Sequence, residues 1–207
     1  MKKPLFIILA GGVGKNFVPL VTNKSIFPFL GKPLIAHTLE MVQKAGANEA
    51  IVICNQENEI LINNLKNLKL KITTIIQPKA LGQANALTLV QNLIPNDQPI
   101  VIANAVDLID PYFLNNFLRQ APHTYAQILG MRVKEYFLGG YLKVSGERVL
   151  DIIEKPARGQ EPSDIANLFF HYFSKPQELF SLLDKQNGND DAYEKALDEL
   201  MKTKEVK

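Results

Sequence analysis

The sequence predicts an α/β fold: a Rossmann-like, mixed but mainly parallel sheet with helices on both faces and a small antiparallel β extension. The first observation behind this prediction is an alternation of short apolar runs with segments of helical period over the first two thirds of the chain. The second is a change to closely spaced β segments after Tyr125. The 207 residues, 46% hydrophobic and 21% charged, are typical of one globular domain, so we expect a single domain over residues 1–207.

The first two thirds of the chain hold the elements of the parallel sheet, with strands and helices in alternation. The expected strands are Leu5 to Leu9, Ala50 to Cys54, Ile72 to Ile76 and Ile100 to Ala103. The expected helices are Pro33 to Ala45, Glu57 to Leu65 and Gly82 to Leu93. Proline at its first position, Lys44 in its last turn and Gly46 just beyond mark the first of these helices clearly.

The rest of the chain predicts the antiparallel extension and two closing helices. The expected β segments are Tyr125 to Val133, Tyr141 to Val144, Val149 to Glu154 and Asn167 to Phe173. The letters VSGER predict a turn between the second and third of them. The expected helices are Pro176 to Lys185 and Asp191 to Lys202.

Charge, hydropathy and cysteine usage exclude several classes of function. The net charge of +2 and the pI of about 8.5 lie below the values above ~9 that mark dedicated nucleic-acid domains. The apolar run from Leu5 to Ala10 is far shorter than the ~20 residues of a membrane span. The single Cys54 and three scattered histidines predict neither a disulfide nor a zinc site. We therefore expect a cytoplasmic protein with neither nucleic acid nor membrane as a partner.

The stretch ILAGGVGKNFVPL, residues 8–20, is a glycine-rich turn after the first strand, a common way to bind phosphate through backbone N–H groups. A dinucleotide fingerprint needs a third glycine, but Phe17 stands there. A P-loop needs glycine where Leu9 stands and serine or threonine where Asn16 stands. Both of these phosphate-binding patterns are therefore disfavoured.

A third phosphate-binding pattern does match the sequence. The letters LAGGVGKNFVPLVT, then Lys24 in KSIFPF, then GKPLI resemble the signature of the sugar-phosphate nucleotidyltransferases, or NDP-sugar pyrophosphorylases, such as glucose-1-phosphate thymidylyltransferase. The segment QPKALGQANAL resembles the family's base-binding segment. The resemblance implies that the nucleotide is bound by Leu9, Ala10, Gly11, Gly12, Gly14, Gln77 and Gly82. It also implies catalytic roles for Lys24, Lys155 and Lys15.

Asp107 in IVIANAVDLIDPYFL resembles the family's Mg²⁺-binding aspartate, at the carboxyl end of an expected parallel strand. Asp110 has a different explanation, because it precedes Pro111 at the head of a helical pattern and fits an N-cap. A second metal-binding aspartate of the family falls near Asp190 or Asp191, of which we take Asp191. An N-cap role for this residue stays an equal alternative.

The letters GGYLKV and DIIEKP resemble the family's sugar-phosphate segments. The resemblance implies that Gly140, Glu154 and Asn167 contact the sugar and that Lys155 binds its phosphate. It also implies a nucleotide-binding half over about residues 1–133 and a sugar-phosphate half over about residues 134–207.

The activity implied is attack of a sugar 1-phosphate on the α-phosphorus of a nucleoside triphosphate, giving an NDP-sugar and pyrophosphate, with Mg²⁺ as cofactor. A phosphate monoester is already largely dianionic at neutral pH, so no protein nucleophile is needed. The enzyme's task is positioning and charge neutralisation. Gln77 favours a pyrimidine, hence dTTP or UTP. We expect a monomer or a homodimer.

Three positions depart from the family pattern. Asn16 replaces an arginine that grips the triphosphate, and Lys15 beside it is expected to compensate in part. Phe169 replaces a glycine, and NAV precedes Asp107 irregularly. These departures leave open a catalytically impaired relative that binds a nucleotide or nucleotide-sugar as a sensor or regulatory subunit. A cytidylyltransferase acting on an alcohol phosphate is a third reading.

Overall fold

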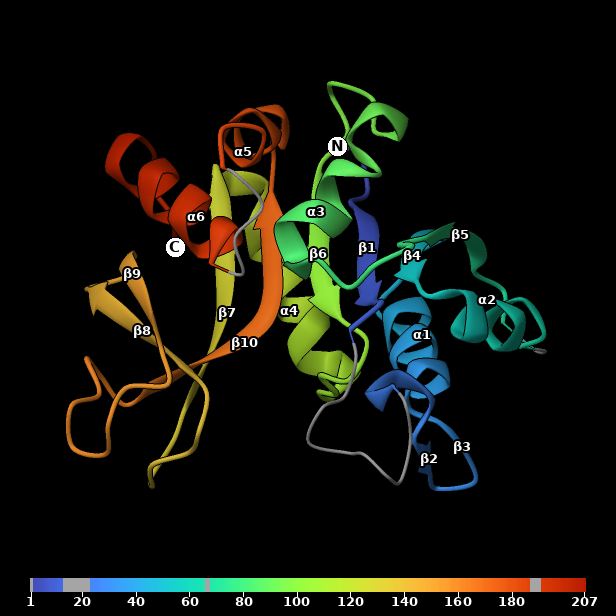
Figure 1. The fold of residues 1–207 in the computed structure, drawn as a ribbon. Helices are drawn as coiled ribbons and strands as arrows, with labels where there is room; N and C mark the ends of the chain where they lie inside the picture. Colours follow the sequence, from blue (N-terminus) through green and yellow to red (C-terminus); the bar gives the residue numbers. More distant parts are fainter. Residues whose placement is uncertain (1, 13–22, 66–67, 187–190) are drawn as a thin grey trace.

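The computed structural model describes residues 2–12, 23–65, 68–186 and 191–207. Within these residues eight strands form one sheet, in the order β5-β4-β1-β6-β10-β8-β9, with β7 paired to the other edge of β10 (Figure 1). A separate hairpin is formed by β2 (Pro28–Phe29) and β3 (Lys32–Pro33). The predicted α/β fold class is confirmed.

One half of the sheet is parallel. It consists of β5 (Lys71–Ile76), β4 (Glu49–Cys54), β1 (Leu5–Ala10) and β6 (Ile100–Asn104). The chain builds outward from β1 to β5 and then returns to place β6 on the opposite side of β1. Ligands of open α/β sheets bind at the carboxyl ends of the strands where the order reverses in this way. This topology points to the edge after β1 and β6.

The other half of the sheet is antiparallel and is organised around the long strand β10 (Ile165–Phe173). The strand β10 pairs with β6 through its last residues and with β8 (Gly140–Ser145) through Ala166. Its other edge pairs with β7 (Ala126–Arg132), where a register shift lies between Leu168 and His171. A hairpin turn with Gly146 at φ 61° joins β8 to β9 (Arg148–Glu154), as the sequence predicts.

Helices cover both faces of the sheet and bury two apolar layers (Figure 1). One layer contains residues of α1 (Leu34–Lys44), α2 (Gln56–Asn63) and α4 (Pro111–Gln120). The other contains residues of α3 (Gly82–Thr88), α5 (Gln177–Leu183) and α6 (Ala192–Thr203). Alternation along the strands divides the side chains between the layers: Phe6 and Ile8 face the first, whereas Ile7 faces the second. Within the described residues, no helix is long and apolar enough to cross a membrane.

The helices end within two residues of the predicted positions, except at the end of α3. Pro33 is the N-cap of α1 and not its first helical residue. The helix α3 ends at Thr88, and a 3-10 turn, η3 (Gln91–Leu93), follows it. Between the two, the N–H of Val90 bonds the carbonyl oxygen of Leu87, three residues earlier. The backbone therefore changes from α-helical to 3-10 hydrogen bonding before Leu93. Asp110 caps α4 as predicted, accepting from the N–H of Tyr112 at 2.8 Å.

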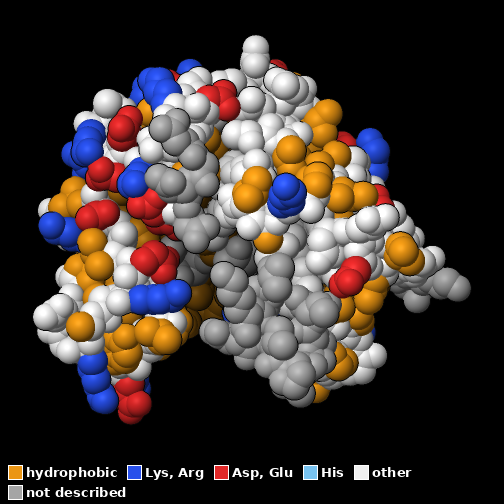
Figure 2. All heavy atoms as spheres, in the orientation of Figure 1, with side chains coloured by type: hydrophobic (Ala, Val, Ile, Leu, Met, Phe, Trp, Pro, Cys, Tyr) orange, Lys and Arg blue, Asp and Glu red, His pale blue; other side chains and the backbone are white. Residues whose placement is uncertain are grey.

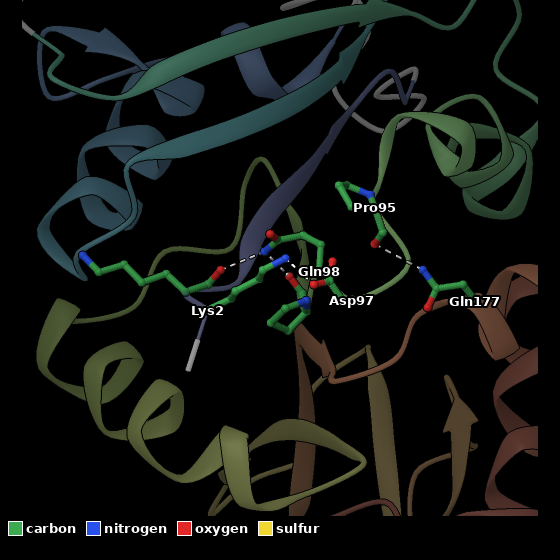
Figure 3. Close-up of polar contacts among 7 residues, drawn as sticks. Lys2, Pro95, Asp97, Gln98 and Gln177 are labelled. Atoms are coloured by element: carbon green, nitrogen blue, oxygen red, sulfur yellow. Dashed lines mark hydrogen bonds and ion pairs between the residues drawn. The ribbon is translucent and has the colours of Figure 1, made fainter.

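The amino-terminal ends of the parallel strands are tied together by the loop before β6 (Figure 3). Lys2 forms an ion pair with Asp97, and Gln98 Nε2 donates to the carbonyl oxygen of Lys3 at 2.8 Å. Gln177 Nε2 at the start of α5 donates to the carbonyl oxygen of Pro95 at 3.3 Å. A hollow of about 420 Å³ lies at this edge and contains none of the predicted site residues.

Candidate active site

A pocket of about 170 Å³ lies at the carboxyl ends of the parallel strands. Five of the predicted nucleotide-binding residues line it: Leu9, Gly11, Gly12, Gln77 and Gly82. The same pocket is lined by Ala80, Gln83, Ala86 and Asn104, which the sequence analysis did not select. Small-molecule pockets usually measure about 300–1,000 Å³, so this one fits a fragment such as a base.

The amide of Gln77 is fixed within the pocket wall. Its Nε2 donates to the carbonyl oxygen of Gly82 at 3.1 Å and to Asn85 Oδ1 at 2.9 Å. Its Oε1 lies so close to Gly11 that a Cβ there would stand 2.7 Å from it. Gly82 has φ 84°, a conformation that side chains with a Cβ rarely adopt. The two glycines and Gln77 therefore depend on one another for their geometry.

Asp107 connects the pocket to the antiparallel half of the sheet. Its Oδ2 accepts from Asn104 Nδ2 at 3.4 Å and from the N–H of Phe169 at 3.3 Å. The register shift in β10 spans Phe169 and leaves it without a β7 partner, while its N–H bonds Asp107. Burial raises the pKa of the Asp107 carboxyl, against the opposing effects of these two hydrogen bonds and of the charge of Lys24.

Lys24 begins a 3-10 turn, η2 (Lys24–Ile26), that a buried polar network attaches to the end of β1. Asn23 Nδ2 and Asn58 Nδ2 both donate to the carbonyl oxygen of Ala10, at 2.8 Å and 3.1 Å. The hydroxyl of Ser25 donates to Asn23 Oδ1 and accepts from Asn58 Nδ2. Asn23, Ser25 and Asn58 are each at most 2% exposed, so this network holds Lys24 at a defined position near Asp107.

Three predicted sugar-contacting residues lie together on β8, β9 and β10. Gly140 pairs with Glu154 across the hairpin. A Cβ on Gly140 would stand 2.6 Å from Glu154 Oε1 and 3.4 Å from the Cβ of Asn167. Glycine at this position therefore leaves room for the carboxylate and the amide to approach the same point. Figure 2 shows charged side chains of both signs gathered over the part of the surface that carries α6, β8 and β9.

Asn167 belongs to a buried hydrogen-bonded group that we call the buried histidine network: Asn167, His171 and Tyr193. Asn167 Oδ1 lies 3.0 Å from His171 Nε2, and the hydroxyl of Tyr193 lies 2.8 Å from His171 Nδ1. His171 is 0% exposed, and its ring stacks on Phe169 with centroids 4.5 Å apart. This network joins β10 to the first turn of α6.

Comparison with known proteins matches this arrangement to one family. The model of the family described as nucleotidyl transferase matches residues 5–207. The chain belongs to this family. Mannose-1-phosphate guanylyltransferase 1 of Arabidopsis thaliana is 30% identical over 162 residues, 72% of this chain and 45% of that protein. Glucose-1-phosphate thymidylyltransferase of Neisseria gonorrhoeae is 26% identical over 173 residues, 80% of this chain and 60% of that protein.

Solved structures show the same fold. A UDP-glucose pyrophosphorylase in complex with UDP-glucose has a TM-score of 0.79 at 20% identity, covering 99% of this chain and 89% of that one. A UTP-bound UGPase from Acinetobacter baumannii has a TM-score of 0.80 at 17% identity, covering 99% and 85%. The chain spans about half the length of the two curated relatives.

Some predicted site residues are placed elsewhere. Gly14, Lys15 and Asp190 lie outside the described residues, as does Asn16. Asp191 is the N-cap residue of α6, but its side chain makes no capping bond and instead pairs with Lys195 Nζ at 2.8 Å. Ala10 contributes its carbonyl oxygen to the network that supports Lys24.

Three functional candidates were missed from the sequence, and two of them carried a weak signal. Asn104 ends β6 and lies opposite Leu9 in the sheet, so it belongs to the same edge as the glycine turn. His171 is the one polar residue of the apolar run Leu168 to Phe173 apart from a tyrosine, which marks it as unusual. Tyr193 gave no such signal, because its partner lies 22 residues away in sequence.

Lys155 has φ 46°, in the left-handed region, and its N–H donates to the carbonyl oxygen of Gly139 at 3.1 Å. That conformation costs roughly 1–2 kcal/mol for a residue with a Cβ, and glycine would avoid the cost. Strained residues that persist are often found at functional sites. The role of Lys155 in binding phosphate stays a prediction.

We expect Lys155→Gly to separate activity from stability. The backbone strain disappears, so the free energy of unfolding should stay unchanged or rise by up to about 1 kcal/mol, while turnover falls at least about tenfold. Leu30→Gly is the matched control, because Leu30 has φ 47° and is 81% exposed in the turn between β2 and β3. It should change stability in the same way and leave turnover intact. Equal turnover in both variants would remove Lys155 from the site.

We expect His171 to make the free energy of unfolding depend on pH. Burial lowers the pKa of its imidazole from 6.5 to about 3 in the folded protein, so the unfolded chain binds more protons between these values. Stability should therefore fall as the pH drops below about 6.5, by about 2 kcal/mol between pH 7 and pH 5 from this group. Urea unfolding at both pH values measures the difference, which should shrink in His171→Gln. An equal difference in the variant would contradict the assignment.

Proposed function

We propose that this chain is a sugar-1-phosphate nucleotidyltransferase that joins a nucleoside triphosphate to a sugar 1-phosphate and releases pyrophosphate. The observation that carries the proposal is a continuous line of contacts from the pocket to the sugar-side residues. Asn104 lines the pocket and bonds Asp107, and Asp107 bonds the backbone of Phe169 on β10. Asn167 lies two residues earlier on the same strand, beside Gly140 and Glu154. Two substrates bound at the two ends would meet near Asp107.

The reaction requires a phosphate oxygen of the sugar 1-phosphate to attack the α-phosphorus while the bond to the leaving pyrophosphate breaks. Lys24, beside Asp107, would neutralise charge on the triphosphate, and Lys155 would hold the attacking phosphate. Both act by positioning and electrostatics, which account for most catalysis in phosphoryl and nucleotidyl transfer. The oxygen nucleophile belongs to the substrate, so the protein needs only to align it.

The residues present fit a Mg²⁺ ion shared with the substrate. Magnesium is usually held by one or two carboxylates together with substrate phosphates and water. Asp107 offers one carboxylate at the strand end, and we propose Asp191 as the second, released from Lys195. When bound, the ion would supply charge neutralisation at the phosphates.

The sugar side suits a polyol by its hydrogen-bonding groups. Glu154 offers acceptors, and within the described part of the chain the amide nitrogen of Asn167 has no hydrogen-bond partner. We propose that residues 1–133 hold the nucleotide and residues 134–207 the sugar phosphate. On the nucleotide side, we propose that Gln77, whose amide is fixed in the pocket wall, contacts a pyrimidine of dTTP or UTP.

A second candidate is a relative that binds the nucleotide or nucleotide-sugar without turnover. Asn16 in place of the arginine favours it, because an amide supplies neither the charge nor the bidentate geometry. Phe169 also favours it, since its ring packs against His171 and Tyr193 at a position where the family has a glycine.

Pyrophosphate release distinguishes the two candidates. The assay combines dTTP, UTP, CTP or GTP with common sugar 1-phosphates and Mg²⁺, for the natural protein and for Asn16→Arg. Release by the natural protein supports the transferase and identifies its substrates. Release only by Asn16→Arg indicates an impaired enzyme on an intact site. If neither releases pyrophosphate but calorimetry detects nucleotide binding, the binding protein is the correct function.

A further inference from the structure

His171 is a polar group in an otherwise apolar layer. It lies fully buried on the face of β10 that packs against α6, where Phe169 and Tyr193 surround it. A buried imidazole without partners would be strongly unfavourable, and an aliphatic residue would fill this layer at no such cost. Both ring nitrogens have partners, so the residue is accommodated by a specific arrangement and not by packing alone.

The chemistry of the partners determines the direction of each hydrogen bond. Asn167 Oδ1 can only accept, so His171 Nε2 must carry the proton and donate. In a neutral imidazole the other nitrogen is then an acceptor, so the hydroxyl of Tyr193 donates to Nδ1. In the observed arrangement the Tyr193 hydroxyl, as donor to Nδ1, favours the tautomer of His171 that carries its proton on Nε2. That tautomer is the one that can donate to the Asn167 oxygen.

This orientation leaves the amide nitrogen of Asn167 as the group available to a ligand. Asn167 lies beside Gly140, whose missing side chain opens space shared with the Glu154 carboxylate. A flipped amide would present an acceptor next to the Glu154 acceptor, and it would require the other tautomer of His171, with the Tyr193 hydroxyl accepting from Nδ1. Only the observed orientation offers a sugar both a donor and an acceptor.

We propose that His171 and Tyr193 are positioning residues that hold the Asn167 amide in the orientation needed to bind the sugar 1-phosphate. The inference rests on the proposed function for its substrate. His171 and Tyr193 act through Asn167. The nucleotide pocket, formed by β1, β6, α3 and the segment after β5, has no residue of the buried histidine network in its wall.

Tyr193→Phe and His171→Leu test the proposal in the full chain. Tyr193→Phe removes one hydroxyl and keeps the ring, and His171→Leu removes the donor to Asn167. We expect the KM for the most active sugar 1-phosphate to rise about fivefold in the first and tenfold or more in the second, with an unchanged KM for the nucleotide. His171→Gln, which can still donate an N–H, should recover part of the loss. Tyr172→Phe is the matched control, because this neighbouring tyrosine faces the opposite apolar layer. It should leave both KM values unchanged.

A second measurement does not depend on turnover. Imidazole ¹⁵N NMR should find the proton of His171 on Nε2 in the natural protein, with that preference lost in Tyr193→Phe. A proton on Nδ1 in the natural protein would overturn the proposal, since Nε2 could not then donate to Asn167. An unchanged sugar KM in folded His171→Leu would overturn it as well. If NMR finds the proton on Nε2 but the natural protein releases no pyrophosphate, the result counts against the proposed function and not against this proposal. The affinity for UDP-glucose, measured by calorimetry, would then replace KM as the readout for the same variants.

Discussion

Asp107→Asn should lower turnover on the order of 10³-fold while the protein folds normally. The amide keeps the shape of the side chain and can still accept from the N–H of Phe169 and from Asn104. It loses the negative charge that would hold Mg²⁺, and a bound metal contributes several kcal/mol of charge stabilisation in such a reaction. Because burial already raises the pKa of this carboxyl, removing its charge should leave stability unchanged or slightly higher. Steady-state kinetics and urea unfolding measure the two effects.

Asp110→Asn is the control for this variant. Asp110 lies three residues further on and caps α4 through the N–H of Tyr112, a role that asparagine performs equally well. We expect natural turnover. A turnover of Asp107→Asn within threefold of the natural protein would show that Asp107 has no part in the reaction, whatever its position.

Lys24→Met should lower turnover on the order of 10²- to 10³-fold, the usual effect of removing one electrostatic group at a developing charge. The fold should be little affected, because the turn around Lys24 is held by Asn23, Ser25 and Asn58 and not by the lysine side chain itself. Pyrophosphate release at saturating substrate measures the loss.

Lys44→Met removes an equal charge from an exposed position in the last turn of α1, near the opposite edge of the sheet. It should keep natural turnover. If both lysine variants lost activity equally, the effect would come from net charge, and the role of Lys24 would be wrong.

Strand and helix positions followed from the sequence because they depend on local period and on boundary residues. The expected strands of the parallel half are all present. The apolar runs of β1, β4 and β6 are buried between the two helical layers, whereas the edge strand β5 is only partly buried. The turn at Gly146 and the cap at Asp110 were likewise predicted from residues within the same few positions. The end of α3 was not predicted correctly, because the change to a 3-10 turn depends on tertiary packing.

Part of the candidate site was also predictable. The nucleotide-side residues Leu9, Gly11, Gly12, Gln77 and Gly82 do line one pocket, and the sugar-side residues Gly140, Glu154 and Asn167 do lie together. Their assignment to substrates remains a prediction. Asn104 was missed because its role depends on which strand lies beside β1, and the sequence does not state the order of strands.

The sequence alone determined the fold class, the family resemblance and the residue types available for phosphate and sugar binding, since these depend on composition, period and spacing. Only the tertiary structure decided which of these residues contact one another. Two hydrogen bonds show this: the one from the N–H of Phe169 to Asp107 and the one between Tyr193 and His171. The first follows from a register shift in β10 and spans 62 residues, and the second requires α6 to pack on that strand. Contacts of this kind depend on how elements pack in space, and no local pattern along the chain encodes them.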